Sequence, residues 1–275
     1  MFELFPRPLL FGHRGASRDA PENTMDSFQL AADIGVDVLE LDVRISYDEQ
    51  LVVIHDETLD RTTNGHGRVR DKTYRELQRL DAAHRFRQQP GPWAGDARSV
   101  TIPRLRDVLE SFPKLGFNIE LKRGGDVVLR RLRRVLQETR ATPERVVLSS
   151  GVHEVMQQLE RELAHYPLGL SRLQVWHALK ATWRRRPLSR ARGQRALQIP
   201  VRLGVLPVAS PRLIAAAHAA AMEVHIWAVN TPATATAWLQ LGADGVISDD
   251  PGAVVYTVRQ FRGRSLAQRR PPAQS

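Results

Sequence analysis

Two hydrophobic patterns alternate along the chain, one repeating every second residue and the other every three or four residues. The first predicts strands and the second predicts helices packed against them. The expected strands are residues 9–13, 38–43, 51–55, 117–122, 145–149, 223–229 and 244–248. One further strand, the sixth along the chain, could lie at 168–171 or at 196–201, because both short stretches fit the strand pattern.

This alternation predicts a mostly parallel sheet with crossover helices. A count of about eight strands favours an α/β fold of the (β/α)8 TIM-barrel type. An open doubly wound sheet is the alternative, but no glycine-rich dinucleotide loop follows the first strand. We expect one barrel domain over residues 1–258, with a small polar insertion over about 59–103 after the third strand. Residues 259–275 are expected to form a basic, disordered tail.

Composition narrows the class of protein. The 275 residues are 42% hydrophobic and include no cysteine, which allows a large core and excludes disulfides and thiolate chemistry. We find no signal-peptide pattern and no bilayer-spanning segment, so a cytoplasmic, soluble protein is expected. The net charge of +10 indicates a basic surface, or else attraction to phosphate-bearing substrates or anionic membranes. The arginine runs at 130–134 and 183–187 lack interleaved stacking residues, which argues against nucleic acid.

Acidic residues occupy one face of two central strands. In VLELDV, Glu40 and Asp42 share a face, and in FNIELK, Glu120 and Lys122 do. If the aliphatic faces pack against helices, these carboxylates point into the barrel near its C-terminal mouth. Buried carboxylates need a compensating cation. A hard divalent ion with oxygen ligands fits them, and the alternative is a set of buried salt bridges to Arg14, Arg44 and Lys122.

Two histidines stand at strand ends. His13 ends LLFGH and His55 ends LVVIH, at the carboxyl edge where barrel active sites lie, so the pair is interpreted as a general acid and base. Their alternative role is capping or core packing. The other histidines considered lack this placement and are expected to be structural or at the surface: His66, His84, His153, His218 and His225.

The residue beside the first histidine suggests the substrate. Arg14 offers planar, bidentate donors to phosphate oxygens, and Lys122 offers a second positive charge. Trp227, near the end of EVHIWAV, is expected either to wall the pocket against an apolar or glycerol moiety or to pack in the core.

Several motifs together resemble one known family. These are HRGASRDAPENT, then GVDVLELDVRISYDEQLVVIHDETLDRTTNGHGRVRD, IPRLRDVLE, NIELK, VHIWAVN and GADGVISDDP. In this order they are similar to the glycerophosphodiester phosphodiesterases, over roughly residues 9–123 and 204–252. The first half of the match is highly specific, whereas residues 150–203 match poorly.

The resemblance implies a metal-dependent phosphoric diester hydrolase with a TIM barrel. Its members cleave glycerophosphodiesters to glycerol 3-phosphate and an alcohol, using calcium or magnesium. The family's catalytic histidines fall on His13 and His55. Its metal-binding carboxylates fall on Glu40, Asp42 and Glu120, and its phosphate-contacting basic residues fall on Arg14 and Lys122. Its PENT segment falls on Glu22 and Asn23, which are expected to hold the loop and Arg14.

Departures from the family pattern are modest. Asp48–Glu49 replaces a glycine-bearing turn, Ala228 follows Trp227 in place of threonine, and SSG follows the fifth strand. The last two leave the choice of substrate open. One rival is a lysophospholipase D-type hydrolase, which the apolar N-terminus (Phe2, Leu4 and Phe5) and basic surface favour. Others are a non-catalytic phosphodiester-binding barrel and a peripheral protein on anionic membrane. The oligomeric state is not predicted.

Overall fold

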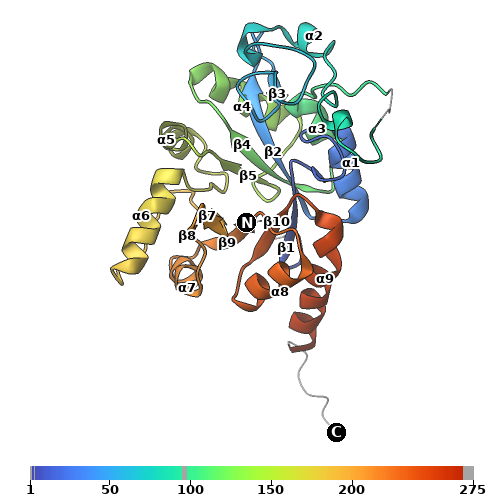
Figure 1. The fold of residues 1–275 in the computed structure, drawn as a ribbon. Coiled ribbons are helices and arrows are strands. Elements are labelled where there is room, and N and C mark those ends of the chain that lie inside the picture. Colours follow the sequence, from blue (N-terminus) through green and yellow to red (C-terminus); the bar gives the residue numbers. More distant parts are fainter. Residues whose placement is uncertain (1, 3, 95–97, 269–275) are drawn as a thin grey trace.

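A nearly closed barrel of seven parallel strands, surrounded by helices, forms the fold (Figure 1). The computed structural model describes the backbone of residues 2, 4–94 and 98–268, and side chains as far as Gly263. The strands follow the order β5–β4–β2–β1–β10–β9–β6. Their bounds are β1 Leu9–His13, β2 Val38–Ile45, β4 Gly116–Leu121, β5 Val146–Ser149, β6 Ala196–Pro200, β9 Glu223–Trp227 and β10 Gly245–Ser248. The barrel prediction is therefore confirmed.

Two positions competed for the sixth strand, and both take part in the barrel. Residues 196–200 form β6, which pairs in parallel with β9. Leu168 makes single bridges to Leu148 of β5 and to Gln194, two residues before β6. This one residue therefore joins the two ends of the sheet.

The strand expected at 51–55 exists, but it lies outside the ring of parallel strands. β3 (Leu51–Val53) pairs antiparallel with the end of β2. The turn over 46–50 is too short for the crossover that a parallel neighbour requires. The insertion follows β3, as expected. It includes α2 (Tyr74–Leu77) and the 3₁₀ turns η1 (Val69–Asp71) and η2 (Phe86–Gln88), and it has an apolar cluster of its own.

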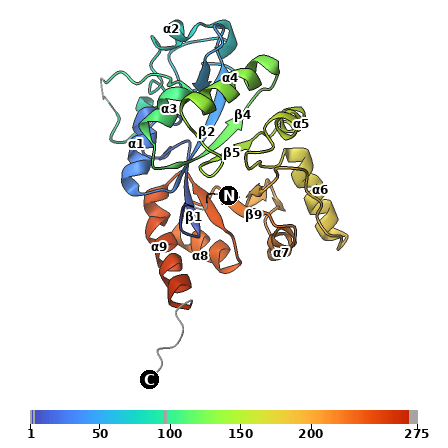
Figure 2. The same cartoon turned by 180° about the vertical axis from the view of Figure 1, so that it is seen from behind.

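Helices cover the outer face of the barrel, as the views from the front and from behind show (Figures 1 and 2). Their first turns are often capped by the side chain that precedes them. Thr24, Ser171, Ser210 and Thr231 each accept a backbone N–H in this way. The bounds are α1 Met25–Ile34, α3 Leu105–Ser111, α4 Asp126–Glu138, α5 His153–Glu162, α6 Arg172–Trp183, α7 Pro211–Ala219, α8 Pro232–Gln240 and α9 Pro251–Gln268.

Strand alternation separates the core from the mouth of the barrel. Leu39, Leu41 and Val43 of β2 are buried in the main apolar cluster shared with the helices, while Glu40 and Asp42 take the opposite face. In the sheet register, His13 lies beside Glu40, and Asp42 lies beside Glu120. The period of two therefore brings charged groups of three strands to neighbouring positions.

The two ends of the chain differ from what was expected. The segment expected to begin a disordered tail at 259 continues α9 as far as Gln268, and Arg262 anchors it by two bonds to the Pro8 carbonyl, at 2.9 and 2.8 Å. Residues 269–275 lie outside the described residues. At the other end, Phe2 is buried against Phe11 and Phe5, so it is unavailable for lipid contact.

Among the described residues, no helix has the length and apolar character needed to cross a membrane.

Candidate active site

Three carboxylates meet at the C-terminal mouth of the barrel. Glu40 and Asp42 come from β2 and Glu120 from β4, and each offers an oxygen within 4.8 Å of the others. Glu40 and Asp42 are buried, whereas Glu120 is partly exposed. This spacing allows all three to contact one small ion.

Neighbouring cations neutralise the three carboxylates to different degrees. The Nζ atom of Lys122 lies 2.7 Å from Asp42 Oδ1 and 2.8 Å from Glu120 Oε2, and Arg14 Nε lies 3.1 Å from Asp42 Oδ2. Burial opposes ionisation of Asp42, but these cations outweigh it and lower its pKa. Burial and the charge of Asp42 raise the pKa of Glu40 to about 7.

The donor set fits a divalent metal ion. Glu40 accepts the backbone N–H of Arg14 at 2.9 Å, and the nearest ring nitrogen of His13 is 3.9 Å away. Its raised pKa shows that the chain's own cations compensate its charge incompletely. All three side chains present hard oxygen ligands of the kind that calcium and magnesium take.

An aspartate orients each of the two candidate catalytic histidines, His13 at the end of β1 and His55, which lies two residues after β3 and not at a strand end as expected. His13 Nδ1 lies 2.5 Å from Asp249 Oδ1, and Asp249 is held in turn by the side-chain amide of Asn230 at 2.8 Å. His55 Nδ1 lies 2.6 Å from Asp56 Oδ1. In both pairs the Nε2 atom is left for other partners, which is the arrangement of a histidine that moves protons.

His13 and the two aspartates carry perturbed pKa values. Burial alone would lower the pKa of His13, but the bond to Asp249 and the charge of Glu40 raise it. Asp249 also meets an opposing burial effect, yet its bonds to His13 and Asn230 lower its pKa to about 2. Asp56 has a pKa of about 2 because Arg61 and His55 overcome its desolvation. Both aspartates are therefore ionised near neutral pH.

A chain of ion pairs joins the second histidine to Arg14. Arg61 Nε contacts Asp56 at 2.5 Å, and its amino groups reach both oxygens of Glu22 at 2.8 and 2.7 Å. Glu22 then accepts from Arg14 at 2.9 Å. Asn23 donates to Asp42 at 2.8 Å and accepts its backbone N–H at 3.2 Å. Glu22 and Asn23 thus hold Arg14 and Asp42 in place.

One cavity of about 580 Å³ contains these groups. Both histidines, Arg14 and Lys122 line it beside the carboxylates, and Trp227 is part of its wall, with its ring centroid 6.5 Å from that of His13. Ser149, Ser150 and Gly151, which depart from the family pattern, also line it. The remaining wall comprises the apolar residues Leu170, Val175, Trp176, Leu179, Pro200, Leu203, Val208 and Ile247, together with Asn118, Arg172 and Gln198.

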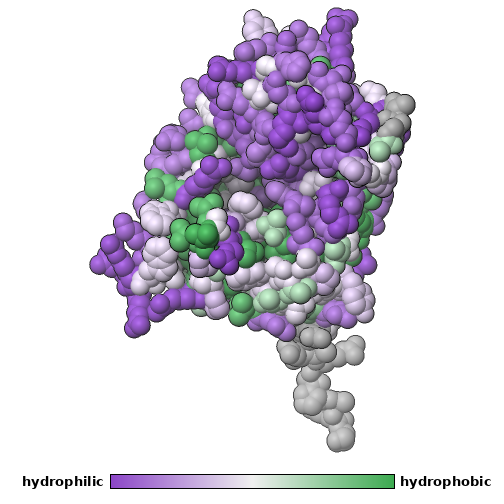
Figure 3. Space-filling model, in the orientation of Figure 1, coloured by the Kyte–Doolittle hydropathy of each residue, from purple (hydrophilic) through white to green (hydrophobic). Residues whose placement is uncertain are grey.

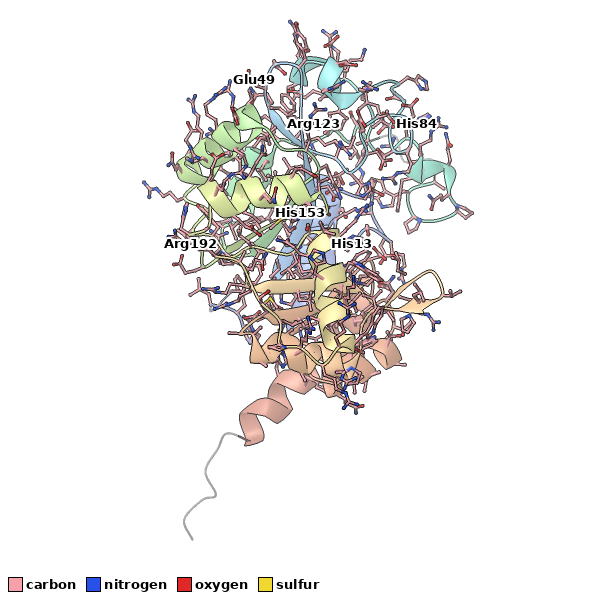
Figure 4. The ribbon with its side chains drawn as sticks, turned by 90° about the vertical axis from the view of Figure 1, so that its left-hand side faces the viewer. His13, Glu49, His84, Arg123, His153 and Arg192 are labelled. Carbon is pink, nitrogen blue, oxygen red and sulfur yellow. The ribbon has the colours of Figure 1, made fainter. Side chains whose placement is uncertain are left out.

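The five other histidines that were expected to be structural or at the surface have other partners or lie in the insertion. His153 lies 3.0 Å from Ser171 Oγ, His218 lies 2.8 Å from Asp244, and the His225 ring is buried against Phe11. His66 pairs with Asp60 in the insertion. His84 also lies in the insertion, away from His13 (Figure 4). None of these five lines the cavity.

Comparison with known proteins decides the family. The model of the glycerophosphoryl diester phosphodiesterase family matches residues 13–253. The chain belongs to this family. A glycerophosphodiester phosphodiesterase of Caldanaerobacter subterraneus is 32% identical over 92% of this chain and 99% of that protein. The rat lysophospholipase D GDPD1 is 29% identical over 87% of this chain and 82% of its own length.

Solved structures agree with the barrel. The crystal structure of a glycerophosphodiester phosphodiesterase from Agrobacterium tumefaciens has a TM-score of 0.73 and 26% identity, over 90% of this chain and 99% of that one. As a member of the glycerophosphoryl diester phosphodiesterase family, this protein is a phosphoric diester hydrolase.

The two aspartates that bond the histidines were not predicted from the sequence as site residues. Asp249 stands in the motif GADGVISDDP and Asp56 in HDETLD, yet the strand pattern does not show that either would bond a histidine. The useful signal is position, because an aspartate directly after a barrel strand lies at the same edge as His13.

Proposed function

We propose that this phosphodiesterase hydrolyses glycerophosphodiesters to sn-glycerol 3-phosphate and an alcohol, by proton transfer through His13 and His55 beside a divalent ion. The observation that supports this most is geometric. Two aspartate-bound histidines line one cavity with Glu40 and Glu120, two members of the acidic cluster. Acid–base catalysis of this kind needs two proton carriers at a single reacting centre.

The histidines divide the proton transfers between them. One accepts the proton of the attacking oxygen, and the other donates a proton to the leaving alkoxide. We assign the base to His13 by family analogy. The attacking oxygen is either the 2-hydroxyl of the glycerol, which gives a cyclic phosphate hydrolysed later, or a water molecule. An analogue without the 2-hydroxyl separates the two routes, because only the water route would turn it over.

Charged side chains bind the phosphate group and the cofactor. Arg14 and Lys122 are proposed to contact phosphate oxygens. The Lys122 ammonium group lies beside the carboxylates of Asp42 and Glu120, next to the proposed ion. Glu40, Asp42 and Glu120 would hold the ion, either Ca²⁺ or Mg²⁺. When bound, this ion supplies positive charge that stabilises the transferring phosphoryl group.

A metal-replacement assay tests this function. Glycerophosphocholine is incubated with the enzyme in EDTA, and then with calcium or magnesium restored, while glycerol 3-phosphate is measured. We expect product only with metal, and a loss of about a hundredfold or more in kcat for His13→Ala and for His55→Ala. Undiminished turnover in EDTA would contradict the metal assignment, and full activity in both variants would contradict the histidine assignment.

A lysophospholipid is the second candidate substrate. The apolar wall of the cavity favours it, and the rat relative is named a lysophospholipase D. Glycerophosphocholine and lysophosphatidylcholine, assayed with one enzyme preparation, separate the two activities. The cytoplasmic location expected from the sequence stays a prediction.

A further inference from the structure

One segment of the barrel carries a large excess of positive charge. Residues 163–222 contain ten Lys and Arg residues and no Asp or Glu. The whole chain has 40 Lys and Arg against 30 Asp and Glu, so the residues outside this segment hold 30 of each and carry no net charge. The charge of +10 on this part of the barrel, which spans α6, β6 and α7, therefore equals the formal charge of the whole chain.

These ten cations are exposed, and in the described part of the chain none of them forms an ion pair with a carboxylate. Arg192, for example, lies at the edge of the molecule (Figure 4). Arg190, Arg195 and Arg202 donate to backbone carbonyls only. The arginine run in α4 behaves differently, since Arg131, Arg133 and Arg134 pair with Glu49, Glu162 and Glu138. Apart from Arg172, which lines the cavity, the cations of residues 163–222 are thus available to an external partner.

Large apolar side chains project from the same segment. Leu203, Val205 and Leu206, in the hairpin of β7 (Arg202–Leu203) and β8 (Leu206–Pro207), are 69%, 83% and 62% exposed. On α6, Trp176 and Trp183 are 46% and 60% exposed and pack edge to face, with centroids 5.6 Å apart. Lys180 lies on this helix face, and Arg184, Arg185 and Arg186 follow directly. Exposed apolar groups of this size mark a binding surface.

This surface is continuous with the cavity. Trp176 and Leu203 belong both to the exposed set and to the cavity wall. Figure 3 shows hydrophobic side chains over β7 and β8 beside a central hollow, while the top of the same face is hydrophilic. A partner seated on α6 and the hairpin would therefore cover the cavity mouth from its apolar side.

We propose that α6, residues 184–186 and the β7–β8 hairpin form a docking surface for an anionic phospholipid bilayer, with the cavity mouth turned toward the membrane. Tryptophan and aliphatic side chains enter the interfacial layer, and arginines bind anionic headgroups. A second copy of the chain is a poorer occupant, because a two-fold contact would bring two unpaired cationic segments together. The docking surface would supply lipid-borne substrates to the site, a consequence that rests on the proposed function.

Vesicle co-sedimentation of the full chain tests the docking surface. With vesicles of equimolar phosphatidylglycerol and phosphatidylcholine, we expect most of the protein to sediment, and to be released by salt or by pure phosphatidylcholine. The double variant Val205→Asp/Leu206→Asp and the triple variant Arg184→Gln/Arg185→Gln/Arg186→Gln should each weaken binding about tenfold or more. Both should keep the wild-type rate on dissolved glycerophosphocholine, because none of these five residues lines the cavity.

Two control variants match these changes elsewhere. Arg131→Gln/Arg133→Gln/Arg134→Gln removes the same charge from paired arginines, and Leu241→Asp introduces an acid at another exposed leucine. Both should bind vesicles as the wild type does. Equal loss in the controls would show attraction by net charge alone and would overturn the proposal.

The remaining outcomes separate docking from catalysis. Hydrolysis of glycerophosphocholine by a wild type that stays in the supernatant would refute docking and leave the proposed function intact. Sedimentation without any hydrolysis would support docking and contradict the function. A dimer by light scattering that Val205→Asp/Leu206→Asp dissociates, together with no vesicle binding, would identify the surface as a self-association face and refute the proposal.

Discussion

Asp249 is the residue whose role is least visible in the sequence and most specific in the structure. Its carboxylate holds His13 Nδ1 at 2.5 Å, which favours the tautomer with Nε2 free for proton transfer. We expect Asp249→Asn to lower kcat by about 10²- to 10⁴-fold with little change in KM. The acidic limb of the pH–kcat profile should also move to lower pH, since Asp249 raises the pKa of His13. Steady-state kinetics between about pH 5 and 9 measure both effects.

The chain offers a matched control for this substitution. Asp244 likewise contacts a histidine, His218, at 2.8 Å and accepts a backbone N–H, but neither residue lines the cavity. Asp244→Asn should therefore keep the wild-type pH profile. If both variants lost activity equally with unchanged profiles, Asp249 would have a structural role only.

At the residue scale, the sequence predicts the site residues that lie on strands, but it does not predict the residues that bond to them. Period two within VLELDV is enough to place Glu40 and Asp42 on one face. The contact between Asp249 and His13 depends on β10 pairing with β1, which joins the last barrel strand to the first. Ring closure of this kind involves residues 236 positions apart, so no local pattern indicates it.

At the scale of secondary-structure elements, the loop between β1 and α1 is important because it positions the catalytic groups. Gly15 has φ +88°, and a Cβ atom there would lie 2.4 Å from Ser27 Oγ and 2.7 Å from the Ser27 carbonyl oxygen. Gly15→Ala should therefore displace the loop that holds Arg14, and lower both kcat and the free energy of unfolding, the latter by more than about 1 kcal/mol. Urea denaturation and the glycerophosphocholine assay measure the two effects.

Gly67 provides the comparison for backbone strain alone. Its φ is +87°, and a Cβ atom would meet nothing within 4 Å. Gly67→Ala should cost only about 1 kcal/mol and keep full activity. Equal effects of the two substitutions would mean that the close packing of the loop on α1 is unimportant.

Secondary-structure elements could be predicted where hydrophobic periodicity and turn length indicate the same pairing. In the first half of the chain, both signals indicate the parallel strands. β3 shares the apolar pattern of a barrel strand, and only the short turn over 46–50 indicates its antiparallel pairing. The end of α9 has a polar, basic sequence typical of a tail. It is ordered as a helix because Arg262 bonds the Pro8 carbonyl and ion-pairs with Asp37, contacts that exist only in the folded barrel.

At the scale of the whole molecule, Glu40 opposes the stability of the metal-free fold. Glu40 has a folded pKa of about 7 against an ordinary value of 4.5, so the folded state resists its ionisation. Its effect on folding is nil below about pH 4.5 and becomes increasingly unfavourable as the pH rises toward 7. Binding of a divalent ion would offset this cost, which links folding to occupancy of the site.

Glu40→Gln should therefore stabilise the metal-free protein and abolish its response to metal. In EDTA at about pH 8, we expect the variant to gain on the order of 1–3 kcal/mol in free energy of unfolding, and this gain to vanish near pH 4. Glu22→Gln should act with the opposite sign, because Arg61 and Arg14 lower the pKa of Glu22 despite its burial. Thermal unfolding of the three proteins, with and without calcium, makes the comparison. A Glu40→Gln protein that is less stable than the wild type in EDTA would show that the chain's own cations already balance the cluster, and would remove the physical reason for a metal there.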